Sequence, residues 1–495
     1  MENINYVTNP MDHFRPEYGE LEPNEFVFPD KPEEACGVIG VYSDDRDFDA
    51  ASLTYLGLYA LQHRGQESTG MVVSDGQHVS THKNMGLVST VYNKDVLSHL
   101  KGRIGIGHVR YSTTGSSLLA NAQPLMARCS RGIMAVAHNG NLVNTEQLRF
   151  KLEQNGSVFQ TTTDTEVIIN LIARHSSETL PDAILKAAQE LKGSFSLILM
   201  TKDTLVGLRD PYGVRPMCLG KVANAYVLAS ENCAFSSIGA SFVRDINPGE
   251  LVIINQDGIQ SFYLPEVAEH ALCAFEYIYF ARPDSNIDGL NVHLARKAMG
   301  RELAAQFSRE ADVVIPVPDT GVSTAIGFAE ASGIPYDIGL IKNTYVGRTF
   351  IQPHQTMRDM GVRIKLNPVV GVLNGKRVVI IDDSIVRGTT SAKIIRLLRE
   401  AGAKEVHMCV SSPPLTHPCY YGIDISVRKE LIASAQSIDA VREFIGADSL
   451  TYLTLEGLAK AVPQRRCLCV ACFNGQYPIQ APQEEESHKY LLEER

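Results

Sequence analysis

The chain has 495 residues, of which 44% are hydrophobic and 21% charged, and this composition excludes collagen-like, disordered and disulfide-scaffold classes. Its net charge of −10 argues against a nucleic acid or an anionic membrane as the default partner. No apolar run reaches the roughly 18 residues of a membrane helix, and the N-terminus carries no secretory signal. We therefore expect a cytoplasmic protein whose ten cysteines stay reduced.

Residues 1–35 form an acidic leader. They contain nine Asp or Glu residues against two basic residues, together with five prolines and no sustained apolar period. This composition predicts an extended or poorly ordered segment. At residue 36 the pattern changes to a strand-like run, 36–42, that opens a globular domain.

Short apolar strands then alternate with helices. We predict strands at 71–74, 104–111, 134–138, 194–200 and 226–230, and helices at 146–154 and 165–175. Asp164 is a candidate N-cap for the second helix. These elements predict a mixed α+β domain that ends near residue 265.

A different pattern begins near residue 311. Continuous aliphatic runs are typical of parallel strands buried on both faces, and they occur here at 312–317, 377–381 and 405–410. The predicted helices between them are 322–332 and 391–401, the second followed by Gly402 as a C-cap. This alternation predicts a doubly wound α/β domain.

Residues 378–390 are the most informative stretch of the second domain. A hydrophobic strand delivers Asp382 and Asp383, and a polar loop then opens a helix whose N-terminus can hold a phosphate. Two carboxylates beside a phosphate make sense if they hold ribose hydroxyls or a Mg²⁺ bound to pyrophosphate. A solvated strand-to-helix turn is the alternative interpretation.

The whole stretch resembles the phosphoribosyl pyrophosphate (PRPP) signature of type I phosphoribosyltransferases. The resemblance implies a PRPP site made of Asp382, Asp383, Ser384, Arg387, Gly388, Thr389 and Thr390. Residues 313–323 resemble the pyrophosphate loop of the same family, which implies that Thr320 joins the two aspartates at one Mg²⁺. The basic segment 342–354 is either a solvated connection or a lid that excludes water, and there we expect Lys342 and Arg348 to contact PRPP.

Cys36 stands directly after the leader. A cysteine in an apolar strand is usually a small core residue. If the Ala35–Cys36 bond is cut, however, the new α-amine lies within reach of the thiol and can act as its base. The position therefore favours a nucleophile.

Other segments supply the groups that an attack on an amide needs. Arg110 ends a strand, where its guanidinium can clamp a carboxylate. Asn139 and Gly140 follow the strand 134–138, and a side-chain amide with a backbone N–H can form an oxyanion hole. Asp164 can neutralise an ammonium group, cap the helix, or do both.

Together with residues 61–67, these segments resemble the N-terminal-nucleophile (Ntn) glutaminase domain of amidotransferases. That resemblance implies an αββα sandwich in which Cys36, Asn139 and Gly140 are catalytic while Arg110 and Asp164 bind glutamine. The order of the two domains, over about 36–475, resembles the family of glutamine PRPP amidotransferases. The family catalyses the first committed step of purine synthesis, converting glutamine, PRPP and water into 5-phosphoribosylamine, glutamate and pyrophosphate, with ammonia passed internally.

The resemblance also implies a domain division and partners. The leader, 1–35, would be a removed propeptide, followed by a glutaminase domain at 36–265, a phosphoribosyltransferase domain at 266–460 and a C-terminal segment at 461–495. The resemblance further implies one Mg²⁺ per subunit, assembly into a homotetramer, and feedback inhibition by AMP and GMP.

Cysteines crowd the C-terminal segment. Cys469 and Cys472 form a C-x-x-C pair, which by itself suggests zinc or redox chemistry. The processed branch of the family carries one [4Fe–4S] cluster per subunit, and the resemblance implies the ligands Cys273, Cys419, Cys469 and Cys472. Zinc in a Cys₄ site is an alternative, as is Cys467 in place of Cys469.

Two other functions compete with this hypothesis. A glutaminase that passes ammonia to another acceptor would not need the PRPP signature. A non-catalytic PRPP-binding regulator would need neither Cys36 nor the amidotransferase segments.

Overall fold

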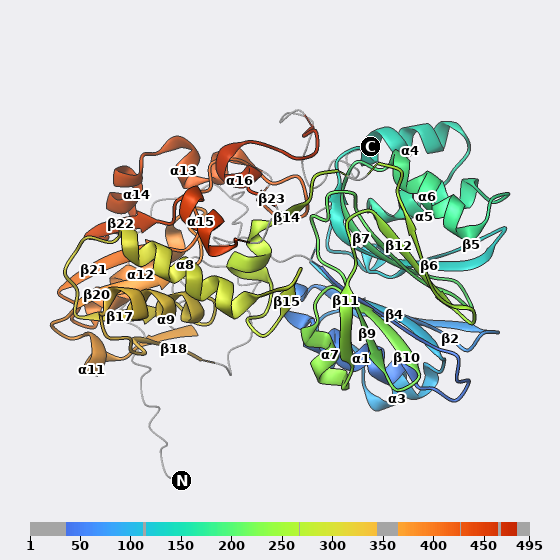
Figure 1. Ribbon diagram of the computed structural model, residues 1–495, viewed down its shortest axis with the longest axis horizontal. Helices are drawn as coiled ribbons and strands as arrows, with labels where there is room; N and C mark the ends of the chain where they lie inside the picture. The colour runs from blue at the N-terminus through green and yellow to red at the C-terminus, as the bar shows by residue number, and fades with distance from the viewer. Residues whose placement is uncertain are drawn as a thin grey trace, which may run out of the picture.

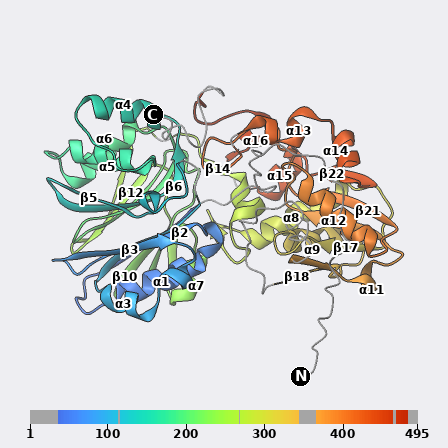
Figure 2. The ribbon, with the colours of Figure 1, turned by 180° about the vertical axis from the view of Figure 1, so that it is seen from behind.

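The computed structural model describes residues 36–111, 115–266, 268–343, 365–425, 427–463 and 467–482. It contains two domains that lie side by side, the first drawn in blue to green and the second in yellow to red (Figure 1 and Figure 2). The predicted leader, Arg348 within the basic segment and the tail from 483 lie outside the described residues. No helix in the described ranges is long and apolar enough to cross a membrane.

Two antiparallel sheets form the first domain. The seven-stranded sheet has the order β11-β9-β10-β1-β4-β2-β3 and the six-stranded sheet the order β13-β12-β8-β7-β6-β5. The strands of the first sheet are β1 (Gly37–Ser43), β2 (Ser68–Ser74), β3 (Val79–Met85), β4 (Ile104–Arg110), β9 (Cys218–Val222), β10 (Ala225–Ala229) and β11 (Ser241–Asp245). Those of the second are β5 (Leu125–Cys129), β6 (Gly132–Leu142), β7 (Gly193–Met200), β8 (Leu205–Arg209), β12 (Glu250–Asn255) and β13 (Gly258–Tyr263).

The two sheets pack face to face. Val38 and Ile106 of the first sheet share one buried core with Ala137 and Ile198 of the second. Helices α1 (Ala50–Ala60) and α7 (Cys233–Ile238) cover the outer face of the first sheet, next to the short α2 (Val88–Val91) and α3 (Lys94–His99). Helices α4 (Thr145–Gln154), α5 (Thr165–Arg174) and α6 (Leu180–Glu190) cover the second. This arrangement confirms the expected αββα sandwich (Figure 1).

A four-stranded parallel sheet forms the centre of the second domain. Its order is β17 (Val313–Pro316), β20 (Arg377–Asp382), β21 (Glu405–Val410) and β22 (Ser449–Tyr452). One face packs on α8 (Val292–Gln306), α9 (Gly321–Ser332) and α15 (Leu455–Ala461), and the other on α11 (Val370–Leu373), α12 (Thr389–Glu400) and α14 (Ile438–Ile445). Because helices cover both faces, β17, β20 and β21 are mainly aliphatic, as the sequence predicted, whereas β22 was not predicted.

Short elements complete the second domain. Strands β18 (Leu340–Lys342) and β19 (Leu366–Pro368) pair antiparallel beside the main sheet. The hairpin β15 (Asn286–Ile287) and β16 (Leu290–Asn291) precedes α8, and α13 (Ile432–Ala435) precedes α14.

The segment that joins the domains is tied to the C-terminal segment. Strand β14 (Ala271–Cys273) pairs in parallel with β23 (Cys467–Cys469), and α16 (Ala471–Asn474) follows. After β14 the chain makes a π-helix at Glu276–Phe280. The C-terminal segment is therefore part of the domain junction.

Candidate functional site

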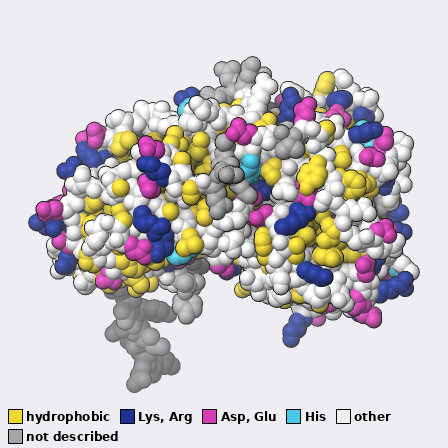
Figure 3. Space-filling view, viewed as in Figure 1, with side chains coloured by type: hydrophobic (Ala, Val, Ile, Leu, Met, Phe, Trp, Pro, Cys, Tyr) yellow, Lys and Arg dark blue, Asp and Glu magenta, His cyan; other side chains and the backbone are white. Residues whose placement is uncertain are grey.

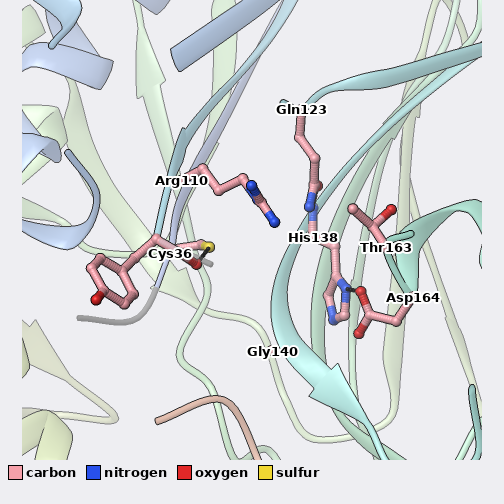
Figure 4. A pocket seen from close by; sticks show the side chains of 8 residues that line it. Cys36, Arg110, Gln123, His138, Gly140, Thr163 and Asp164 are labelled. Carbon is pink, nitrogen blue, oxygen red and sulfur yellow. Dashed lines mark hydrogen bonds and ion pairs between the residues drawn. The ribbon is translucent and has the colours of Figure 1, made fainter. Parts of the chain in front are cut away.

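A pocket opens where the two sheets of the first domain meet. In Figure 4, Cys36 faces His138 and Asp164 across this space, and the guanidinium of Arg110 points between them. The pocket is lined by Cys36, Arg110, Tyr111, Gln123, His138, Gly140, Thr163 and Asp164. Four of the five residues that the sequence assigned to glutamine chemistry thus line one pocket, and the fifth, Asn139, is their chain neighbour. Gln123, His138 and Thr163 were not anticipated.

Cys36 immediately precedes β1 and is almost fully buried. Its Sγ donates to the carbonyl oxygen of Tyr111 at 3.2 Å. Burial raises the pKa of the Cys36 thiol to about 12, although the nearby Arg110 guanidinium lowers it in part. Because a neutral thiol is a weak nucleophile, this pocket needs a base that takes the proton during attack.

Asn139 and Gly140 lie inside β6, which continues to Leu142, and not beyond the end of a strand as the sequence suggested. The register explains the extension, since Asn139 pairs with Ser196 and Gly140 with Phe195 of β7. The φ of Gly140 is +147°, and a Cβ there would lie 2.1 Å from the carbonyl oxygen of Ser194. Only glycine fits this position without strain.

Asn139 is fully buried, yet neither Oδ1 nor Nδ2 of its side chain has a hydrogen-bond partner among the described residues. A buried polar group without a partner costs about 1–3 kcal/mol. Such a cost is offset when a ligand or a reaction intermediate supplies the missing partner. Asn139 is thus a buried amide that lies in the chain between His138 and Gly140, which both line the pocket.

Arg110 and Asp164 provide opposite charges in the same pocket. The Arg110 guanidinium donates to the carbonyl oxygens of Ser116 at 3.1 Å and Gly115 at 3.4 Å. Burial raises the pKa of the Asp164 carboxyl, but His138 and the hydrogen bond from the N–H of Leu142 lower it by more. The pKa of Asp164 therefore lies below its usual range. Asp164 is thus ionised at neutral pH.

The position of Asp164 corrects one expectation. It precedes α5, but its side chain makes no capping hydrogen bond to the helix. Its Oδ2 accepts instead from the backbone N–H of Leu142 at 3.1 Å, at the end of β6. The carboxylate ties the pocket wall to the strand that carries Asn139 and Gly140.

The second candidate site lies at the carboxyl ends of β17 and β20. These strands are parallel neighbours, with Pro316 opposite Ile381, so the loops that follow them meet. Thr320 donates its hydroxyl to Asp383, and the Ser384 hydroxyl donates to the same carboxylate at 2.7 Å. The Oδ1 atom of Asp382 accepts from the N–H of Asp383 at 2.9 Å. The structure therefore brings together Thr320, Asp382 and Asp383, the three residues predicted to hold magnesium.

The rest of the predicted PRPP residues surround this point. Gly388, with φ +81°, is the left-handed residue that opens α12, and Thr389 and Thr390 form its first turn. Arg387 pairs with Glu430. Lys342, at the end of β18, reaches Asp319 of the neighbouring loop.

The four predicted cluster cysteines lie together at the domain junction. The parallel pairing of β14 with β23 sets Cys273 opposite Cys469. The carbonyl of Cys472 accepts from the N–H groups of Thr416 and His417, which brings the 413–422 loop and its Cys419 alongside. Cys273, Cys469 and Cys472 belong to one hydrophobic core, and Cys419 packs against it. Burial is the main cause that raises the pKa of each of these thiols.

Four cysteine thiolates can hold either an iron–sulfur cluster or a tetrahedral zinc ion. Cys469 pairs directly with Cys273, whereas Cys467 pairs with Ala271, two residues earlier on the same strands. The pairing favours Cys469 as the ligand beside Cys273.

Buried charges connect the first domain to this junction. Arg64 of the predicted 61–67 segment ion-pairs with both Glu231 and Glu276, and Arg215 pairs with Glu276 at 3.0 Å. His63, Glu231 and Cys233 also lie close enough together to suggest a cation site. The Glu231 carboxylate already forms a buried ion pair with the Arg64 guanidinium, and the positive charge of Arg64 disfavours a metal ion beside it.

Comparisons with known proteins agree with this geometry. Residues 108–237 match a family model described as a glutamine amidotransferase domain, and residues 287–426 match a phosphoribosyl transferase domain. The amidophosphoribosyltransferase of Bacillus subtilis is 51% identical over 91% of this chain and 95% of its own length. That of Methanocaldococcus jannaschii is 48% identical over 90% of this chain and 98% of its own length.

Solved structures extend the likeness to three dimensions. The glutamine PRPP amidotransferase of B. subtilis, complexed with ADP and GMP, superposes with a TM-score of 0.85 at 50% identity, covering 90% of this chain and 98% of that one. The two domains occur in the same order in both proteins. This protein is thus an enzyme of the first step of purine synthesis that uses glutamine and PRPP, and its chain belongs to the amidophosphoribosyltransferase family.

Proposed function

We propose that the reaction is divided between the Cys36 pocket and the Asp383 loops, with ammonia passing internally from one to the other. Asn139 is the observation that carries this proposal, because a buried amide without a partner is what an oxyanion hole requires before substrate binds. Bulk water would protonate ammonia and remove its nucleophilic lone pair, so transfer within the protein preserves its reactivity.

In the first half-reaction, Cys36 Sγ attacks the side-chain amide carbon of glutamine. The α-amine of Cys36 accepts the thiol proton and then donates a proton to the leaving ammonia. The N–H groups of Asn139 and Gly140 stabilise the oxyanion, Arg110 binds the α-carboxylate and Asp164 binds the α-ammonium group. Water then hydrolyses the thioester to release glutamate.

In the second half-reaction, ammonia forms a C–N bond at the ribosyl C1 as the bond to pyrophosphate breaks. Ser384, Arg387, Gly388, Thr389 and Thr390 bind the phosphate and ribose groups. Lys342 and Arg348 also bind PRPP. Asp382, Asp383 and Thr320 would hold one Mg²⁺, which neutralises charge on the leaving pyrophosphate. The carboxylate and hydroxyl oxygens of these residues are ligands that suit a hard cation.

Maturation follows from the same chemistry. The amine can act as a base only if the chain begins at Cys36, so residues 1–35 are a propeptide that is removed. The N-terminal mass of the purified protein tests this directly, and an intact leader in the active enzyme would refute it.

Cys273, Cys419, Cys469 and Cys472 hold one [4Fe–4S] cluster with a structural role. Their grouping at the domain junction supports a metal site that is shared by all four thiolates. Reduced thiols are needed to hold it, which supports a cytoplasmic location. Iron and acid-labile sulfide near four each per subunit are expected, whereas one zinc per subunit would contradict the assignment.

Purine nucleotides are proposed as feedback inhibitors, and a homotetramer as the assembly. The B. subtilis relative was solved with ADP and GMP, and the PRPP loops supply a phosphate site at which AMP or GMP can compete. On the face shown in Figure 3, basic and acidic side chains are interspersed.

One assay tests the function as a whole. The purified enzyme should form 5-phosphoribosylamine from PRPP with either glutamine or ammonium salts. Failure with both nitrogen sources in a cluster-containing protein would overturn the proposal.

A further inference from the structure

The loop that follows Cys419 reaches across the domain junction and contacts the strand that carries Asn139 and Gly140. Two consecutive carbonyls of this loop accept hydrogen bonds from the first domain. Asn141 Nδ2 donates to the Tyr420 carbonyl at 3.0 Å, and Ser194 Oγ donates to the Tyr421 carbonyl at 2.8 Å. Arg215 is a second donor to the Tyr421 carbonyl, at 2.9 Å.

These contacts are linked to the cysteine group. The backbone N–H of Tyr421 donates to Cys419 Sγ at 3.4 Å. Tyr421 is therefore held on one side by Cys419 and on the other by Ser194. Its position depends on both domains.

The next residue, Gly422, packs directly on Gly140. Gly422 has φ +96°, and a Cβ there would lie 3.2 Å from the carbonyl carbon of Gly140 and 3.3 Å from its oxygen. The backbone of Gly140 is held from the other side by Ser194, whose carbonyl would be only 2.1 Å from a Cβ at Gly140. Gly140 is thus enclosed between β7 and the cysteine-bearing loop.

We propose that residues 419–422 position the oxyanion-hole donor of the glutaminase site, with Gly422 as the residue that sets the place of Gly140. The inference rests on the proposed roles of Gly140 and of the cysteines. It extends those roles by assigning the cysteine group a specific effect on catalysis, namely to hold the loop against the strand. Neither Gly422 nor Tyr421 lines the Cys36 pocket, so we assign both a positioning role.

The test is the substitution Gly422→Ala in the full-length, cluster-containing enzyme. The added methyl group requires a shift of a few tenths of an ångström in Gly140, in Arg215 or in the loop. Removing an oxyanion donor altogether costs about 10²–10³ in kcat, and a small displacement should cost about tenfold. We expect this loss in kcat for glutamine hydrolysis, with KM for glutamine and ammonia-dependent synthesis within about twofold of the parent.

Gly258→Ala is the matched control. Gly258 has φ +97°, almost the same backbone conformation, but no atom lies within 4 Å of the position of its Cβ. It carries the same left-handed strain without the contact to Gly140. Its glutamine hydrolysis should equal that of the parent.

A second variant, Ser194→Ala, weakens the contact between the loop and the first domain without adding a methyl group. It removes one of the two donors to the Tyr421 carbonyl. We expect a smaller loss, about threefold, again only in kcat for glutamine hydrolysis. Iron content is measured in every variant and should equal that of the parent.

Three results would overturn the proposal: unchanged glutamine kcat in Gly422→Ala, an equal loss in Gly258→Ala, or joint loss of iron and of both activities in Gly422→Ala. Asn139→Ala distinguishes these from failure of the underlying function. If Asn139→Ala lowers glutamine kcat and Gly422→Ala does not, the oxyanion site stands and only the positioning role fails.

Discussion

The two candidate sites place their polar groups on different kinds of backbone. Around Cys36, the proposed donors Asn139 and Gly140 lie in the interior of β6, which pairs with β7, and the loop from the second domain packs against Gly140. Around Asp383, they lie on loops at the carboxyl ends of parallel strands. Amide hydrolysis needs donors that are in place before charge develops, whereas a polyanionic substrate can be bound by loops that assemble around it.

The comparison predicts that damage to one site should leave the other working. The largest effect is expected for Cys36→Ser, which replaces the nucleophile. Glutamine-dependent synthesis should fall about 10³-fold or more, because a lost covalent nucleophile removes most of the rate enhancement. Ammonia-dependent synthesis should remain within about twofold, as measured in parallel assays. Loss of both activities in a folded, iron-containing variant would contradict two separate sites.

Asn139→Ala tests the rigid site without touching the nucleophile. The side chain is buried and lacks partners in the described structure, so its removal breaks no internal hydrogen bond. The Asn139→Ala variant should therefore unfold at nearly the same temperature as the parent. Its kcat for glutamine hydrolysis should fall about 10²–10³-fold, the usual effect of removing one oxyanion donor. Steady-state kinetics and a thermal melt together check this. A large fall in melting temperature would indicate a structural role instead.

Substitution of the paired carboxylates tests the loop site. Asp382→Asn and Asp383→Asn each remove a contact to a charged ligand, which is worth about 1.5–3 kcal/mol. PRPP affinity should fall roughly 10- to 150-fold, and glutamine- and ammonia-dependent synthesis should fall together. Calorimetric titration with PRPP and Mg²⁺ measures the affinity directly. Unchanged affinity in both variants would remove the assignment of this loop.

The same contrast explains what the sequence could predict. Residues 378–390 carry nearly the whole loop site in one continuous stretch, so its motif was recognisable and the structure brings Thr320 to Asp383 as expected. The Cys36 pocket is assembled from separate segments. Gln123 and Thr163 belong to no motif, and nothing in the sequence indicated that they would join it.

The domain junction was the least predictable region. Arg64 pairs with Glu231 and Glu276, which lie 167 and 212 residues away along the chain. No local period connects residues so far apart, and burial of charged groups contradicts the usual preference of their residue types. Likewise, the extension of β6 through Asn139 depends on its register with β7, which the polar residues 138–141 concealed.

The final prediction concerns pH and distinguishes two ways in which the Cys36 thiol could lose its proton. The thiol has a pKa raised to about 12 by burial, so the thiolate is scarce throughout the physiological range. An α-amine has an ordinary pKa of about 7.7–8.0 and accepts a proton only above that value. If the amine is the base, kcat/KM for glutamine falls about tenfold per pH unit below roughly 8 and reaches a plateau above it. If the thiol ionises unaided, the rate instead continues to rise through pH 9.5, since its own pKa is still far above. Glutamine hydrolysis measured from pH 6 to 9.5 at saturating PRPP distinguishes the two. A plateau would connect the removal of residues 1–35 to catalysis, and a continued rise would contradict the amine as base.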